Sequence, residues 1–146
     1  MEIDIKASTS KLTSKQFGDA CEHLISAELG FAGRPNTIMP GGWPDYDIIA
    51  SDGQHISAKG TDERDGGDKA WWKFSPDSWD WLALIKFHRS GERSIFLVPH
   101  DVAIKLSSDP DSDGDYRLRC NCPELQAWRN NFTLDSHPAE SPDRLT

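Results

Sequence analysis

The chain has 146 residues, of which 36% are hydrophobic and 27% are charged, and this composition excludes an intrinsically disordered protein. The length suits one domain with a substantial hydrophobic core and is too short for two domains of ordinary size, so we expect a single domain over residues 1–146. The net charge of −8 disfavours a large nucleic-acid-binding surface, because such a surface needs many cations to neutralise phosphates.

Targeting signals and cysteine usage indicate the compartment. The chain has no apolar run of about 18 residues, and its start, MEIDIKASTSK, lacks the apolar stretch of a secretory signal. The three cysteines, with Cys120 and Cys122 only two positions apart, do not make the framework of a disulfide-stabilised secreted protein. We therefore expect a cytoplasmic protein without a membrane-spanning segment.

Both ends of the chain are polar. Residues 1–12 form a polar lead-in, in which the alternation of residues 2–6 predicts a short edge strand. Residues 135–146 form a polar tail.

A helix is predicted over residues 14–29. Thr13 and Gln16 have the spacing of a capping box, and Gly30 supplies the predicted stop. The predicted buried stripe consists of Phe17, Ala20, Cys21 and Leu24. An adjoining line consists of Gly18, Glu22, Ile25 and Leu29. Glu22 therefore lies on the flank of the apolar face, either as a surface residue or as a functional acid.

Three strands are expected next, over residues 36–39, 45–50 and 54–59, with a turn at residues 51–53 joining the last two. Side chains alternate along a strand, so Asp45 and Asp47 share one face of the strand predicted over residues 45–50.

Ser57 and Lys59 share one face of the strand predicted over residues 54–59, and the hairpin brings this face beside the face that carries Asp45 and Asp47. Two carboxylates beside a lysine are suited to metal-assisted hydrolysis of a phosphodiester, because they offer oxygen ligands and a positive charge near the phosphate.

The second half of the chain yields weaker predictions. A polar, glycine-rich loop is expected at residues 60–70. The aromatic cluster at residues 71–74 is expected to form a further strand or to cover the sheet. Further expectations are a helical turn capped by Ser75 over residues 76–81, a hairpin of strands 82–87 and 94–98, an acidic surface loop at 107–116, and a short helix at 123–132 that starts with Pro123. Together these elements predict an α/β fold, bordering on α+β, with a central mixed sheet flanked by helices.

The region of residues 14–60 resembles the core of the PD-(D/E)XK nuclease superfamily, which includes restriction endonucleases and archaeal Holliday-junction resolvases. Pro44-Asp45 matches the PD pair, Asp47 followed by Ile-Ile-Ala matches an acid before an apolar strand, and Ser57-Ala58-Lys59 lies where the acid-x-lysine is expected. Gly18-x-x-x-Glu22 resembles the upstream helix glutamate of many members.

The resemblance implies a metal-dependent endonuclease that hydrolyses phosphodiester bonds in DNA. Asp47 would be the main metal ligand, with Asp45 or Glu22 as the second carboxylate, and Lys59 would position the attacking water. The implied cofactor is Mg²⁺ or Mn²⁺. A homodimer would allow two sites to reach two strands.

Ser57 departs from the family pattern, because its hydroxyl replaces the usual acid and is a weaker ligand for a divalent cation. One alternative is therefore a catalytically inactive binding or regulatory module with a protein partner. Another is an acidic inhibitor or immunity-type protein that meets a basic partner. A third interpretation of the hairpin itself is an ordinary surface ion pair between Asp45 and Lys59.

Cations and tryptophans elsewhere leave two further questions. The cations could form a basic patch or be scattered over the surface; they are Arg34, Lys69, Lys73, Lys86, Arg89, Arg93, Arg117 and Arg119. The tryptophans could stack on single-stranded bases or pack in the core, which is more common; they are Trp71, Trp72, Trp79 and Trp81.

Overall fold

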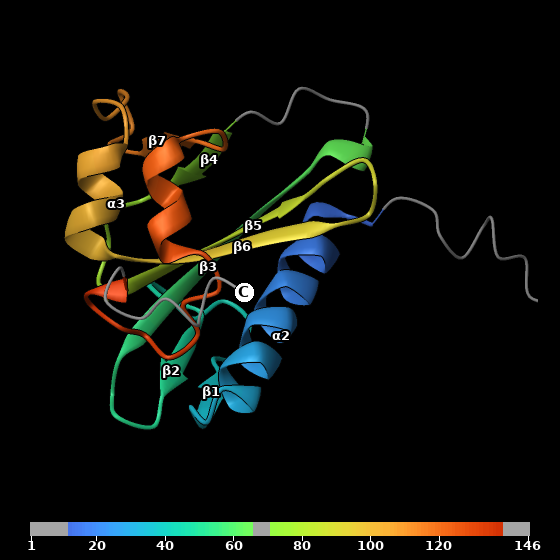
Figure 1. The fold of residues 1–146 in the computed structure, drawn as a ribbon, viewed down its shortest axis with the longest axis vertical. Coiled ribbons are helices and arrows are strands. Elements are labelled where there is room, and N and C mark those ends of the chain that lie inside the picture. The colour runs from blue at the N-terminus through green and yellow to red at the C-terminus, as the bar shows by residue number, and fades with distance from the viewer. Residues whose placement is uncertain (1–11, 66–70, 139–146) are drawn as a thin grey trace, which may run out of the picture.

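The computed structural model describes residues 12–65 and 71–138 (Figure 1). The predicted strand at residues 2–6, part of the predicted loop at 60–70 and most of the polar tail lie outside the described residues. No helix in the described ranges is long and apolar enough to cross a membrane. The elements, in chain order, are α2 (Ser14–Phe31), β1 (Asn36–Ile38), β2 (Ile48–Ala50), β3 (His55–Asp62), η1 (Glu63–Asp65), β4 (Trp71–Phe74), β5 (Trp81–Phe87), β6 (Arg93–Pro99), α3 (His100–Leu106), β7 (Tyr116–Arg119) and η2 (Pro123–Trp128).

The predicted α/β fold with a central mixed sheet and flanking helices is confirmed. Five strands form the main sheet in the order β1-β2-β3-β5-β6, and β4 pairs with β7 in a separate two-stranded sheet. Within the main sheet β3 and β5 run parallel, whereas the other neighbours run antiparallel. Figure 1 shows α2 on one side of this sheet and the layer of α3, η2, β4 and β7 on the other.

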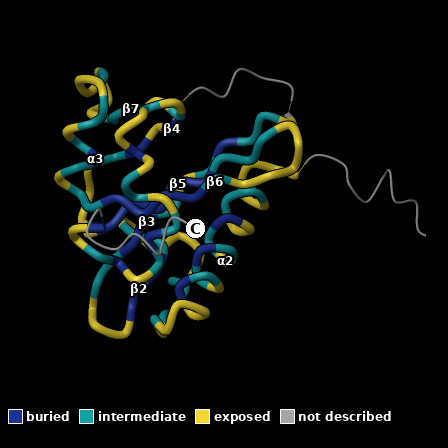
Figure 2. Tube along the Cα trace, viewed as in Figure 1, coloured by how far each residue is buried: buried dark blue, intermediate teal, exposed yellow. Residues whose placement is uncertain are grey.

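The interior strand β5 is buried on both faces over residues 81–85. Trp81, Ala83 and Ile85 belong to the core beneath α2, whereas Leu82 and Leu84 belong to the core beneath β4 and α3. Figure 2 shows this burial as the dark stretch through the middle of the molecule. Because both faces of β5 are covered over residues 81–85, this part of its sequence is continuously apolar and does not alternate, which is typical of a sheet enclosed by two layers.

Helix α2 begins as predicted, since the side chain of Thr13 accepts from Gln16 N and the side chain of Gln16 accepts from Thr13 N. Its predicted end is wrong. The helix continues through Gly30, and Gly33 (φ 84°) provides the left-handed position that stops it. Gly33 N donates to Gly30 O and Arg34 N donates to Leu29 O, which is the Schellman pattern.

The buried side of α2 differs from the predicted stripe. Cys21, Ile25 and Leu29 are fully buried, and Phe17 and Leu24 pack partly against the same core. Ala20, which was predicted to be buried, is exposed. The apolar side therefore follows the line at i, i+4 and i+8 from Cys21, where the helix touches β3.

The predicted hairpins exist, with shifted bounds. The second hairpin, β5 with β6, is confirmed. In the first, β2 starts at Ile48 rather than at residue 45. The prediction that Asp45 and Asp47 share one face of a strand is therefore wrong. β3 continues to Asp62 because residues 56–62 pair with β5 along their whole length.

Four segments of the second half differ from the sequence-based predictions. Residues 75–80 form no helical turn, because Trp79 is buried and its indole Nε1 donates to Ser75 O (2.9 Å) instead. Helix α3 and strand β7 were not predicted, since each is short and lacks its own periodic pattern. The predicted short helix beginning at Pro123 is a 3₁₀ helix in which Leu125 is buried.

Strand β3 packs closely against α2 at Gly60, and this contact can be tested. A Cβ atom at Gly60 would lie 2.5 Å from Cys21 Sγ and 3.0 Å from Phe17 Cε2. We expect Gly60→Ala to lower the free energy of unfolding by about 1–3 kcal/mol through overpacking, measured by urea denaturation. Gly18→Ala is the matched control, because nothing lies within 4 Å of its added Cβ and alanine favours a helix. Equal stability of the two variants would contradict the close packing.

Candidate active site

A pocket opens beside the β2–β3 hairpin, on the side of the sheet that faces the β4–β5 connection. Its volume of about 130 Å³ is smaller than the roughly 300–1,000 Å³ of pockets for drug-sized ligands, and suits a phosphate group or a hydrated ion. Four of the five predicted site residues lie here together. The lining residues are Trp43, Asp45, Tyr46, Asp47, Ser57, Lys59, Ser75, Asp77 and Trp79.

Asp47 is held by the backbone of the neighbouring strand. Its Oδ2 accepts a hydrogen bond from Ala58 N (2.8 Å), and Ser57 Oγ donates to the same oxygen at 3.5 Å. The backbone of Asp47 is tied in as well, since its N–H donates to Ile56 O (2.9 Å). These contacts orient the carboxylate and occupy one oxygen, while the other oxygen carries no hydrogen bond from a described residue.

Asp45 reaches the pocket by an unusual backbone conformation. Its φ of 78° lies in the left-handed region, which is costly for residues other than glycine and is best tolerated by Asn and Asp. Residues in such conformations concentrate at functional sites. Asp45 is exposed and lines the pocket from the bend before β2.

Lys59 projects from β3 into the pocket with its side chain exposed. No carboxylate in residues 12–65 and 71–138 lies within ion-pair distance of its ammonium group, which contradicts the interpretation of the hairpin as an ordinary pair between Asp45 and Lys59. As far as the described residues are concerned, the ammonium group is therefore available for an anion that enters the pocket.

Ser57 lies in the wall of the pocket between these groups. It is 7% exposed, and its register on β3 places it beside Asp47. A hydroxyl there donates to the carboxylate instead of adding a second negative charge. The acid that the resemblance leads one to expect is therefore replaced by a neutral donor.

Glu22 does not line the pocket but is electrostatically coupled to it. Burial raises the pKa of Glu22 above its ordinary value, and the negative charge of Asp47 raises it further. Asp47 is therefore the carboxylate that influences both the pocket and the flank of α2. A raised carboxyl pKa beside a cleft is typical of functional sites and also occurs in structural ones.

Asp77 is a third acid of the pocket that the sequence analysis missed. It comes from the connection between β4 and β5, and Ser75 Oγ donates a hydrogen bond to its Oδ2. Nearby Trp79 is buried and also lines the pocket. The segment carries no local motif, and only the parallel pairing of β3 with β5, which returns the chain across the sheet, brings Asp77 to this place.

An aromatic wall completes the pocket. The Tyr46 ring stacks on the His55 ring with centroids 3.8 Å apart and an interplanar angle of 8°, and Trp43 meets Tyr46 edge to face. Trp43 is 47% exposed.

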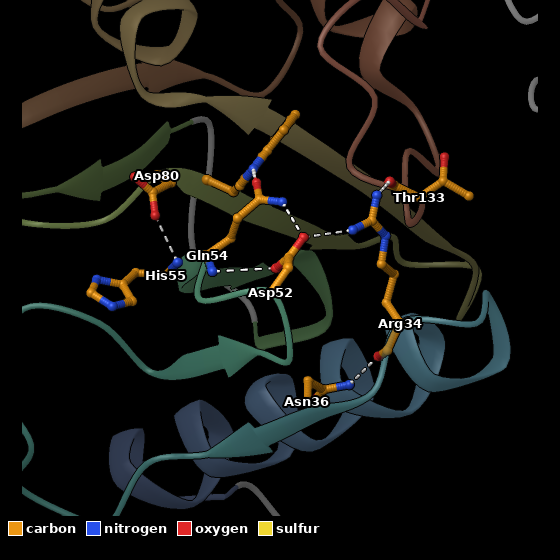
Figure 3. A network of polar contacts seen from close by, with 8 residues as sticks. Arg34, Asn36, Asp52, Gln54, His55, Asp80 and Thr133 are labelled. Carbon is orange, nitrogen blue, oxygen red and sulfur yellow. Dashed lines mark hydrogen bonds and ion pairs between the residues drawn. The ribbon is translucent and has the colours of Figure 1, made fainter.

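His55 is itself fixed by a polar network (Figure 3). The backbone N–H of His55 donates to a carboxylate oxygen of Asp80, and the ring Nδ1 of His55 lies 3.1 Å from Ser78 O. In the same network Asp52 joins Arg34 to Gln54, which holds the turn between β2 and β3. The aromatic wall is thus anchored to the sheet rather than carried by a free loop.

The acids of the pocket suit a cation that keeps several of its waters rather than one coordinated entirely by protein side chains. No group of three or more His, Cys, Asp or Glu side chains in the described ranges is arranged to hold a metal ion. Mg²⁺, however, is usually bound by one or two carboxylates together with several waters and substrate oxygens. Asp47 with Asp45 or Asp77 meets that smaller requirement.

The predicted cations do not form a patch at the pocket. None of the seven that lie in the described residues lines it, and Lys69 is outside those residues. Arg34 pairs with Asp52 at 2.8 Å and Lys86 pairs with Glu63 at 2.9 Å. Three of the four tryptophans considered for stacking are buried, as core packing predicts; the fourth, Trp71, is 38% exposed.

Comparison with known proteins adds evidence on the fold. No protein-family model and no curated protein sequence matches the chain. Among solved structures it is similar to the bacterial homing endonuclease I-Ssp6803I, with a TM-score of 0.58 and 12% sequence identity over 93% of this chain and 100% of the other. At this identity the likeness shows a shared fold.

The raised pKa of Glu22 predicts a pH-dependent effect on stability. The Glu22 carboxyl holds its proton more tightly in the folded chain than in the unfolded chain, where its pKa is about the ordinary 4.5. The free energy of unfolding therefore falls as the pH rises from 4.5 through the pKa of Glu22 in the folded chain. We expect Glu22→Gln to be more stable than the wild type at pH 7 and to lose that advantage at pH 4, measured by urea denaturation. Glu28→Gln on the same helix is the control. A Glu22→Gln difference that does not change with pH would contradict the coupling.

Proposed function

We propose that this protein is a divalent-metal-dependent nuclease of the PD-(D/E)XK type that hydrolyses phosphodiester bonds in DNA. The observation that carries the proposal is the convergence of Asp47 and Lys59 in one pocket, where no carboxylate of a described residue forms an ion pair with the lysine. Asp47 directly precedes β2, and Lys59 lies on the neighbouring strand β3, in a fold shared with a homing endonuclease. The family assignment rests on these motif residues together with that likeness.

The roles follow from the chemistry of each group. Bound Mg²⁺ or Mn²⁺ would supply positive charge to the phosphate and lower the pKa of a coordinated water. Asp47 offers as the main ligand the carboxylate oxygen that accepts no hydrogen bond from a described residue, because Ala58 N already fixes the other oxygen. The Lys59 ammonium group would orient the attacking water and stabilise the negative charge that develops at phosphorus.

Asp77 is the group best placed to supply the carboxylate that Ser57 lacks. It lines the same pocket, comes from a different segment, and is oriented by Ser75. Asp45 offers a further oxygen from the bend before β2. Under this proposal the acid position of the motif has moved to the β4–β5 connection, and Ser57 keeps a supporting hydrogen bond to Asp47.

A catalytically inactive binding module is the second candidate. Two observations favour it: Ser57 stands in the acid position, and no group of three or more ligand-type side chains in the described part of the chain is arranged to hold a metal ion. Such a module would keep the pocket and the Lys59 charge for binding an anion without cleaving it.

Loss of the lysine separates these candidates. We expect Lys59→Ala to reduce metal-dependent cleavage of supercoiled plasmid at least about 100-fold, because it removes the charge that stabilises the transition state. Asp47→Asn should have a similar effect, since its amide oxygen can still accept from Ala58 N while the negative charge is lost. The assay compares initial rates in Mg²⁺ and in Mn²⁺ at low salt.

Lys15→Ala, an exposed lysine at the start of α2, is the control for loss of a positive charge. Cleavage that persists unchanged in Lys59→Ala would contradict the proposed site. An inactive wild type that still binds DNA would favour the second candidate.

The role of Asp77 predicts a change in the metal requirement. We expect Asp77→Asn to raise the Mg²⁺ concentration for half-maximal cleavage about tenfold or more, because one oxygen ligand loses its charge. Asp101→Asn, an exposed acid on α3, serves as the control. An unchanged Mg²⁺ titration in Asp77→Asn would show that the second carboxylate is another residue.

A further inference from the structure

The outer face of the two-stranded sheet formed by β4 and β7 concentrates positive charge on an otherwise acidic protein. Burial alternates along both strands, so that Trp72, Phe74 and Leu118 pack inward. The residues that point outward are Trp71, Lys73, Arg117 and Arg119, and we call this set the ribbon face.

The strand register pairs these outward residues directly. Trp71 lies opposite Arg119, and the Arg119 guanidinium stands 4.6 Å from the centre of the Trp71 ring. Lys73 lies opposite Arg117. Two like charges at directly opposed positions destabilise a sheet unless anions lie beside them.

Nearby acids only partly neutralise these cations. Asp111 lies 3.8 Å from both Lys73 and Arg117, and Asp115 lies 3.6 Å from Lys73. Charge-assisted hydrogen bonds are about 2.7–2.9 Å long, so these are loose ion pairs. The ammonium and guanidinium donors remain able to bind another acceptor.

The ribbon face leads into the wall of the pocket. β4 ends at Phe74, and the next residues along the chain include Ser75 and Asp77, which line the pocket. Two residues of extended chain span at most about 7 Å, so Lys73 lies close to the pocket wall. Duplex DNA carries about one negative charge per 1.7 Å of helix axis, so a phosphate in the pocket has neighbours within reach of the ribbon face.

We propose that the ribbon face binds the phosphate backbone of duplex DNA next to the cleaved bond. The inference rests on the proposed nuclease function and names the surface by which an acidic protein holds a polyanion. Guanidinium groups match phosphate oxygens in geometry, and two-stranded ribbons are a known shape for docking on DNA. The contacts are to the backbone, so they position the duplex without reading its sequence.

The test measures binding apart from cleavage, by fluorescence anisotropy of a labelled DNA duplex in EDTA over a series of salt concentrations. We expect Lys73→Gln to weaken binding roughly three- to tenfold and to reduce the slope of log affinity against log salt by about 1. Arg117→Gln combined with Arg119→Gln should weaken binding further. Lys15→Gln is the matched control, because α2 lies on the opposite side of the sheet from β4 and β7 (Figure 1).

A second variant changes the charge in the other direction. Asp111 Oδ1 accepts from Asp113 N (2.9 Å) and Asp115 N (3.1 Å), and the amide oxygen of Asp111→Asn can keep both bonds. Removing the negative charge beside Lys73 and Arg117 should tighten duplex binding, whereas simple damage to the loop would weaken it. Circular dichroism melting of each variant checks that the fold is retained.

Equal affinity of Lys73→Gln and Lys15→Gln would overturn the proposal, as would weaker binding by Asp111→Asn or no duplex binding by the wild type at low salt. The two proposals fail separately. A wild type that cleaves DNA while the ribbon variants bind normally refutes the ribbon face alone. Ribbon variants that lose binding in a protein that cleaves nothing refute the nuclease function and support the ribbon face.

Discussion

The parallel pairing of β3 with β5 is the constraint on which the rest of the structure depends. Parallel neighbours cannot be joined by a tight turn, so the chain leaves the sheet after Asp62 and returns to it at Trp81. On the way it forms β4, which covers the face opposite α2. The same detour brings Ser75 and Asp77 to the side of Ser57 and Lys59. One topological requirement therefore creates the second core and closes the pocket.

Features encoded by neighbouring residues could be predicted from the sequence. The capping box at Thr13 and the glycine turn after β2 are local, and both helix start and turn are found where expected. The convergence of Asp47, Ser57 and Lys59 also followed from short-range reasoning, since a hairpin turn determines which residues oppose one another. Alternation then decides which side chains share a face.

Features that depend on distant partners could not be predicted. Asp77 joins the pocket only through the crossover between parallel strands, and β7 is a strand only because β4 is there to pair with it. The segment before Trp81 has the residues of a helix start, yet burial of Trp79 overrides that preference. Gly30 was a reasonable stop signal, but the left-handed position that ends α2 falls at Gly33.

The left-handed backbone of Asp45 has a consequence for reading any related sequence. With φ at 78°, this position accepts glycine, asparagine or aspartate far more readily than other residues, whatever the chemistry of the pocket. An aspartate recurring here among relatives would therefore be ambiguous evidence for metal binding. Alanine would disturb the bend and the charge together, whereas asparagine keeps the bend and removes only the charge. An aspartate can thus be retained at this position for its backbone conformation alone.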